Sequence, residues 1–80
     1  MRITRRNNLG KPVEVVCKDE FGDIVVFRLT GISLQKTYKV DQRPWYDVPN
    51  GDWQKFSPDQ LRGVACLLDG LAYGEDLDAD

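Results

Sequence analysis

Aromatic side chains are the residues of this sequence that most clearly suggest a binding chemistry. Four of the chain's eight aromatic residues fall within residues 44–56, around the turn VPNG at 48–51. Tryptophan and tyrosine concentrate where proteins bind other proteins or single-stranded nucleic acids, because their rings offer a large and rigid contact area. Two aspartates flank the same turn. The residues predicted to bind a partner are therefore Trp45, Tyr46, Asp47, Asp52 and Trp53.

A structural role competes with this interpretation of the aromatic segment. A chain of 80 residues has a thin core, since it buries only about 60–65% of its unfolded surface. Each ring covers roughly 150–250 Å² when buried, so the segment could be a lid that closes an open end of the sheet. Three rings exceed what a lid needs. We expect at least one tryptophan inside and one or more of Trp45, Tyr46 and Trp53 exposed.

The residues for common enzyme mechanisms are absent from the sequence. There is no histidine, which excludes Ser-His-Asp and Cys-His catalysis and an imidazole acid or base. No glycine-rich phosphate-binding motif occurs, and two cysteines are too few for a zinc site. Asp47 and Asp52 could act as a carboxylate pair, but turn aspartates usually bond to the backbone. The sequence predicts no enzyme, no metal and no cofactor.

Basic residues suggest an alternative partner, a single-stranded or structured nucleic acid. Basic groups that bind phosphates, interleaved with rings that stack on bases, are typical of such sites. The low isoelectric point of about 5.0 argues against this alternative. The residues that would serve it are Arg2, Arg5, Arg6, Lys36, Lys39 and Arg43, with Tyr38, Trp45 and Tyr46 between them.

Charge is also distributed unevenly along the chain, whose net charge is only −2. Residues 1–11 contain four basic and no acidic side chains, whereas residues 69–80 contain five acidic and no basic ones. Either the two ends are solvated tails, or one of them docks on a partner of opposite sign.

Alternation of apolar and polar residues predicts the strands. Residues 13–18 and 24–30 form a hairpin around the turn DEFGD, and residues 32–40 continue as strand. The apolar positions change parity across Gly31, which indicates either a bulge or a hairpin turn, and we expect a strand that bends there. Residues 2–4 are either an edge strand or part of a frayed tail over 1–8.

A helix after Ser57 is the best-specified element. Ser57 and Gln60 have capping-box spacing, Pro58 suits the first helical position, and Phe56 and Leu61 are placed as a hydrophobic staple. We expect the helix to end at Gly70 or Gly74 and residues 75–80 to fray. The stripe predicted to face the core contains Leu61, Val64, Ala65, Leu68, Leu71 and Ala72.

The opposite face of this helix contains small residues. A glycine inside a helix costs about 1 kcal/mol relative to alanine, so Gly63 needs a reason. Either it is simply tolerated, or the face packs against a partner or a second copy of the chain. The residues predicted for that contact, which would make a homodimer, are Gly63, Cys66, Leu67 and Gly70.

These elements predict a single α+β domain over residues 1–80, in which an antiparallel sheet of three to four strands packs against one C-terminal helix. A bent half barrel of SH3-like or OB-like shape would use the same elements. Cys17 should lie inside and Cys66 outside as free thiols, and with no signal or membrane segment this favours the cytoplasm.

We therefore expect a non-enzymatic protein that binds and modulates or inhibits a larger macromolecule. A protein partner is favoured over nucleic acid. A phage or mobile-element accessory protein that acts on a nucleic-acid-processing machine would fit this description.

Overall fold

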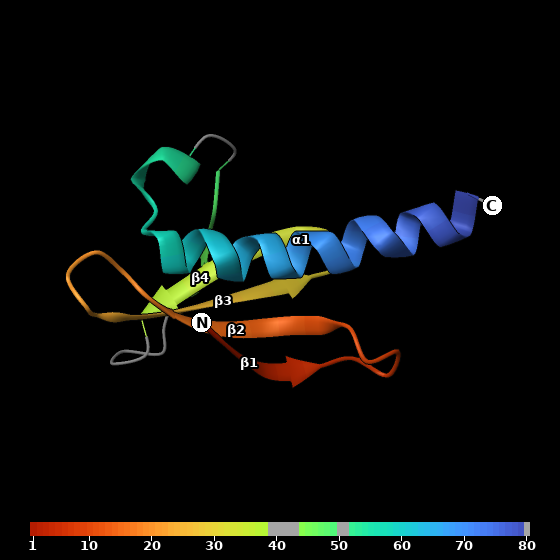
Figure 1. The fold of residues 1–80 in the computed structure, drawn as a ribbon, viewed down its shortest axis with the longest axis horizontal. Coiled ribbons are helices and arrows are strands. Elements are labelled where there is room, and N and C mark those ends of the chain that lie inside the picture. The colour runs from red at the N-terminus through yellow and green to blue at the C-terminus, as the bar shows by residue number, and fades with distance from the viewer. Residues whose placement is uncertain (39–43, 50–51, 80) are drawn as a thin grey trace.

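The computed structural model describes residues 1–38, 44–49 and 52–79, with the side chains of 52, 53 and 71–79 outside that description. One antiparallel sheet packs against one long helix (Figure 1), so the predicted α+β class is confirmed. The sheet is open, and its five strands follow the chain order β1-β2-β3-β4-β5. The strands are β1 Arg2–Arg6, β2 Pro12–Lys18, β3 Ile24–Thr30, β4 Ser33–Tyr38 and β5 Tyr46–Asp47.

The number of strands corrects one expectation. The sheet has five strands rather than three to four, because β1 spans most of the segment expected to fray and β5 pairs with β4. The strands β1 and β5 are the two edges of an open sheet, and the expected half barrel of SH3-like or OB-like shape is not confirmed. Asp19 closes the predicted turn after β2 by accepting the N–H groups of Phe21 and Asp23.

The chain reverses at Gly31 instead of bending there. The pair Thr30 and Ser33 closes the β3–β4 ladder, so Gly31 and Ile32 form a two-residue hairpin loop. Gly31 has a φ of 63°, a left-handed conformation that glycine adopts without steric cost. The expected bent strand is therefore wrong. The predicted parity still holds, since Leu34, Lys36 and Tyr38 lie opposite residues of β3 that face the helix.

The helix α1, Pro58–Ala79, follows the short 3-10 helix η1, Asp52–Lys55, and begins as predicted. The backbone N–H of Ser57 donates to Gln60 Oε1 at 2.8 Å, and the Gln60 N–H donates to Ser57 Oγ at 3.2 Å. This reciprocal capping box is buried. The helix continues through Gly70 and Gly74, where we expected its end, and in Figure 1 its C-terminal part projects past the strands.

The helix packs on the sheet with a different face from the one predicted. The buried residues are Gln60, Gly63, Val64 and Leu67, whereas the predicted core residues Leu61, Ala65 and Leu68 are exposed. A Cβ atom on Gly63 would overlap Cys17 Sγ and lie 3.0 Å from Val15 Cγ2. Gly63 is therefore the point of closest approach between α1 and β2, and the missing side chain decides which face turns inward.

This packing overturns the predicted back face of the helix. Gly63 and Leu67 are buried against the sheet and cannot contact a partner. Gly70 is half-buried beside Lys11 and Pro12, and Cys66 is half-buried. Both cysteines are free, and Cys17 lies inside as predicted.

One hydrophobic core joins the two layers. Its centre is the fully buried Phe27, whose ring lies 5.4 Å from that of Phe56. Phe56 therefore packs on the sheet, while Leu61, its predicted staple partner, is 41% exposed. The buried cluster consists of Val15, Cys17, Val25, Phe27, Leu34, Val64 and Leu67.

Candidate functional site

The side of the sheet opposite α1, here called the far face, carries the candidate site. Its side chains come from the strand positions that alternate with the core residues. Cross-strand pairing places Val16 beside Val26 and Val26 beside Thr37 there. Val26 and Thr37 are buried, and the Thr37 hydroxyl donates to the Pro44 carbonyl at 3.1 Å. Pro44, two residues before β5, therefore lies against this face.

Trp45 is held on the far face by the side chain of Arg28. The guanidinium carbon of Arg28 lies 3.8 Å from the centre of the Trp45 ring, a cation–π stack. Arg28 Nε donates to Gln35 Oε1 at 2.9 Å, and Gln35 Nε2 donates to Asp47 Oδ1 at 3.2 Å. Both Trp45 and Arg28 are partly exposed. A half-exposed indole is thus fixed in place by a connected polar network.

The same polar network is one row of a ladder that crosses the sheet. Register pairs Arg5 with Glu14, Glu14 with Arg28, Arg28 with Gln35, and Gln35 with Asp47. Opposite charges are neighbours at the Arg5–Glu14 and Glu14–Arg28 pairs, an arrangement that stabilises cross-strand neighbours. The neutral Gln35 side chain then bridges Arg28 and Asp47 by hydrogen bonds, so the row holds its side chains in place.

Strand β1 adds further positive charge to the far face. Two register shifts interrupt its pairing with β2, and the paired positions place Arg2, Arg5 and Arg6 on one side. All three are exposed, and Arg6 Nη1 donates to the Gly10 carbonyl at 2.8 Å. Among the described strand residues of this face, basic side chains outnumber acidic ones, although the chain as a whole is acidic. The basic residues are Arg2, Arg5, Arg6, Lys18 and Arg28, and the acidic ones are Glu14 and Asp47.

The aromatic segment is divided between the two sides of the sheet. Tyr46 pairs with Lys36 and therefore lies on the helix side, where it is 49% exposed, whereas Trp45 lies on the far face. Neighbouring residues alternate because residues 46 and 47 form a strand, which the sequence did not predict. Val48 packs against the core, so part of the segment does close the interior. The side chains of Asp52 and Trp53 are outside the described residues.

The basic residues proposed for nucleic acid are likewise brought together only in part. Arg2, Arg5 and Arg6 share a face with Trp45, and Arg28, which no sequence pattern indicated, lies there with them. Lys36 is on the helix side, opposite Phe27, with its Nζ 6.0 Å from the Phe56 ring. Tyr38 is also on the helix side, and Lys39 and Arg43 lie outside the described residues.

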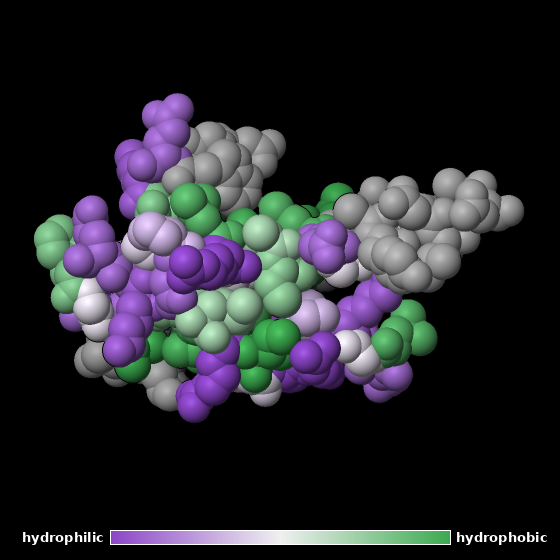
Figure 2. All heavy atoms as spheres, viewed as in Figure 1, coloured by the Kyte–Doolittle hydropathy of each residue, from purple (hydrophilic) through white to green (hydrophobic). Residues whose placement is uncertain are grey.

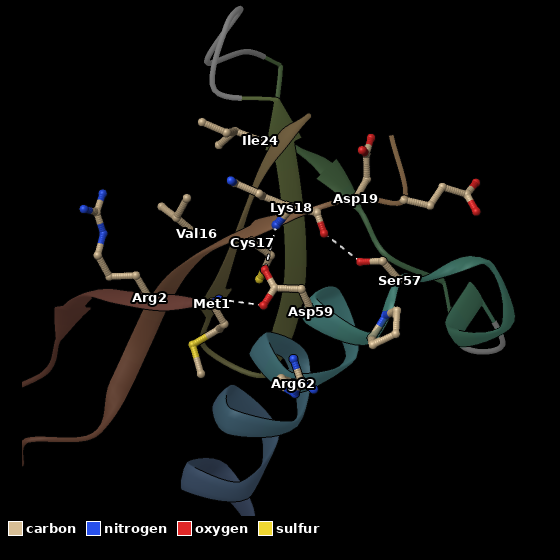
Figure 3. A pocket seen from close by; sticks show the side chains of 12 residues that line it. Met1, Arg2, Val16, Cys17, Lys18, Asp19, Ile24, Ser57, Asp59 and Arg62 are labelled. Atoms are coloured by element: carbon tan, nitrogen blue, oxygen red, sulfur yellow. Dashed lines mark hydrogen bonds and ion pairs between the residues drawn. The ribbon is translucent and has the colours of Figure 1, made fainter. Parts of the chain in front are cut away.

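A second candidate is an open hollow of about 880 Å³ where α1 begins (Figure 3). Asp59 lies at its centre, and its Oδ1 accepts from the Met1 α-ammonium group at 2.6 Å. Asp59 Oδ2 accepts the Lys18 N–H at 2.8 Å, and Ser57 Oγ donates to the Lys18 carbonyl at 2.6 Å. These bonds join the helix start to the end of β2. The Asp59 carboxylate is thus already engaged by the protein itself.

The titration behaviour of this hollow argues for a structural role. Hydrogen bonds from the Met1 ammonium group and the Lys18 N–H lower the pKa of Asp59, so the carboxylate is ionised at neutral pH. Burial, followed by the Asp59 charge, raises the pKa of Cys17 to about 11, which keeps its thiol protonated. A general acid needs a raised carboxyl pKa and a nucleophilic cysteine a lowered one. The pKa of Asp59 is lowered where a general acid needs it raised, and the pKa of Cys17 is raised where a nucleophile needs it lowered.

Two further observations concern the described residues. They contain no group of three metal-ligating side chains that could hold an ion. Among the helices of the described chain, none is long and apolar enough to cross a membrane.

Comparison with protein-family models, curated proteins and solved structures found no match for this chain.

Proposed function

We propose that this chain is a small, non-enzymatic interaction protein that binds a larger macromolecule, and so modulates it, through the β5 edge and the far face of its sheet. The observation that carries the proposal is the Trp45 indole, half-exposed and stacked on Arg28. Tryptophan, tyrosine and arginine are the residues that most often dominate binding energy at protein interfaces.

Pre-organisation is the physical reason for choosing this surface. Ordering a flexible side chain costs about 0.5–1.5 kcal/mol on binding. Arg28 is already fixed by Gln35 and by the Trp45 ring, so a partner would not have to order it again. Tyr46, exposed on the other side of the same edge strand, gives a partner that encloses the β5 edge a second ring to contact.

A nucleic-acid partner is the second candidate function, and the charge of the far face favours it. Three exposed arginines of β1 lie on the face that holds the Arg28–Trp45 stack. Arginines that bind phosphates beside a ring that stacks on bases would suit a single strand. A protein partner remains our first proposal because the chain is acidic overall and the Glu14 charge on this face partly neutralises its arginines.

Site-specific photo-crosslinking tests the proposal and separates the two partners. A photoreactive amino acid is placed at position 45, at 46, or at the matched control position 21, where Phe21 is 81% exposed on the β2–β3 turn. In extract of the source cells, we expect a discrete adduct from positions 45 and 46 and none from 21. The adduct should be sensitive to protease and resistant to nuclease. No adduct at 45 or 46, or the same adduct from 21, would contradict the proposal.

Binding to a fluorescent single-stranded oligonucleotide provides the complementary measurement. A nuclease-sensitive adduct, together with an affinity that falls steeply with salt, would establish the second function in place of the first. In that case Trp45→Ala should weaken binding by roughly 1–3 kcal/mol, the usual value of one stacked base. Lack of binding at low salt would leave the protein partner as the proposed one.

A further inference from the structure

The outward side of α1 carries an apolar surface that the domain itself does not use. Leu61 is 41% exposed and Leu68 is 36% exposed, and Ala65 between them is also exposed. Figure 2, which views the molecule from the helix side, shows a pale green area over the middle of the helix with purple side chains beside it. The sequence pattern had assigned Leu61, Ala65 and Leu68 to the core.

A shallow hollow lies within this surface. It has a volume of about 600 Å³ and is lined by Arg62, Ala65, Cys66, Leu68 and Asp69. Positions 62, 65, 66 and 69 are spaced so that four neighbouring side chains on a helix surround a hole. When two helices pair, a side chain from one enters such a hole on the other. The small residues Ala65 and Cys66 leave this hole open, and Leu68 borders it.

The charges at the rim of the hole determine what can fill it. Arg62 and Asp69 lie at its two ends, two helical turns apart. Within the part of the chain whose side chains are described, neither forms a hydrogen bond or an ion pair. An antiparallel copy of the same helix would bring its Asp69 to Arg62 and its Arg62 to Asp69. A two-fold interface of this kind is complementary to itself.

We propose that α1 is the interface of a homodimer in which two copies of the helix pack antiparallel. Ala65 of each copy occupies the hole formed by residues 62, 65, 66 and 69 of the other, Leu68 flanks this contact, and two Arg62–Asp69 pairs close the ends. A register one heptad away would place Arg62 against Arg62, so the charges select this alignment. The interface lies on the helix side and leaves the far face free, so this proposal and the proposed function stand or fall separately.

Sedimentation equilibrium of the full chain over a concentration series tests the association. We expect the mass to rise from 9.1 kDa toward twice that value. Leu68→Glu should weaken association by at least roughly tenfold, because it places a charge at the border of the apolar contact, where the partner helix would bury it. The matched control is Ile32→Glu, a change at an 82% exposed residue of the β3–β4 turn, which should associate like the unsubstituted chain. A single 9.1 kDa species up to millimolar concentration would overturn the proposal.

Charge reversal tests the antiparallel alignment. Arg62→Asp and Asp69→Arg should each weaken the dimer roughly tenfold or more, because each creates two like-charged contacts. The double variant Arg62→Asp/Asp69→Arg restores opposite charges at both ends, so its affinity should return close to the original. A double variant that dimerises no better than either single variant would rule out this alignment.

Alkylation of Cys66 gives a readout that does not depend on mass. Cys66 lines the hole and is half-buried, whereas Cys17 is fully buried with its pKa raised to about 11. We expect Cys66 to react alone, and its rate to fall as the protein concentration rises through the dimerisation range. The rate should not change with concentration in Leu68→Glu. An unchanged rate of Cys66 alkylation in the original chain would count against an interface with a second copy. It would count equally against an interface of this surface with any other partner present under the same conditions.

Discussion

The two sides of the sheet are built from the same strands but have opposite physical characters. Phe27 and Arg28 are neighbours in β3, yet Phe27 is fully buried under α1 and Arg28 lies on the far face against Trp45. Val15 and Glu14 are divided in the same way in β2. The helix side holds the close-packed apolar core, whereas the far face carries a row of polar and charged side chains and one ring beside the buried Val26 and Thr37. The comparison shows that the residues that stabilise the fold lie on one side of the sheet, whereas the surface proposed for binding lies on the other.

The difference has an energetic cause. Burial of an apolar side chain stabilises a fold by about 1.5–3 kcal/mol, whereas exposed ion pairs contribute roughly 0–1 kcal/mol each. The far face can therefore carry charges that serve a partner at little cost to folding. Charged side chains cannot replace apolar ones on the helix side at so little cost, because Gly63 brings the helix into direct contact with Cys17 and Val15.

The largest expected effect is that of Leu67→Ala on the helix side. Leu67 is fully buried, so the loss of its side chain leaves a cavity and should lower the free energy of unfolding by about 2–5 kcal/mol. The matched control is Leu68→Ala, a change at the neighbouring residue, which is 36% exposed and should cost about 1 kcal/mol or less. Urea unfolding at a concentration where the chain is monomeric measures both values. Equal losses would mean that the helix face has been assigned incorrectly.

Substitutions of two glycines in the same helix should have effects of opposite sign. Gly63→Ala forces α1 away from Cys17 and should lower the free energy of unfolding by about 1–3 kcal/mol. Gly70→Ala meets only ordinary contacts at 3.8 Å and should stabilise the chain by up to about 1 kcal/mol through helix propensity. Thermal unfolding of both variants checks the pair. A stabilising Gly63→Ala would show that the helix does not approach β2 so closely.

Asp59→Asn tests the junction of the two layers, where the start of α1 is bonded to the end of β2. At neutral pH we expect it to lower the free energy of unfolding by about 1 kcal/mol. The pKa of Asp59 in the fold lies below its ordinary value of 3.8, so its stabilising effect is complete above that value. The effect is lost as the pH falls through the lowered pKa of the folded state. As the pH falls below 3.8, the free energy of unfolding should therefore decrease less steeply for Asp59→Asn than for the original chain. Asp69→Asn, which changes an exposed aspartate, is the control. An acid unfolding curve of Asp69→Asn identical to that of Asp59→Asn would contradict the role assigned to Asp59.

The smallest expected effect lies on the far face. Arg28→Met keeps most of the side-chain volume and removes the charge above Trp45, which should cost about 0.5–1 kcal/mol of stability. The adduct formed from position 46 should nevertheless weaken, because the neighbouring Trp45 ring has lost its support. The free energy of unfolding in urea and the crosslinking yield measure the two effects. A stability loss as large as that of Leu67→Ala would show that the far face also belongs to the core.

Parts of the candidate site could be predicted from the sequence, and the reasons for the failures are specific. Trp45, Tyr46 and Asp47 were selected by residue type alone, but their division between the two sides depends on β5, a two-residue strand with no periodic signal. Arg28 was not selected, because only the register of β3 with β4 and β5 places it beside Gln35 and the aromatic segment. The three N-terminal arginines share a face because of two irregularities in β1 that leave no mark in the sequence.

The sequence by itself determined the local features of this protein. The capping box at Ser57 and Gln60, the alternation in β2 and β3 and the aspartate-closed turn at 19–23 arise from neighbouring residues, which interact in any context. Only the tertiary structure decided the face of α1 that turns inward. The apolar periodicity favoured the stripe with Leu61 and Leu68, but the close contact of Gly63 with β2 outweighs that stripe, since contact area between packed layers grows as two backbones approach.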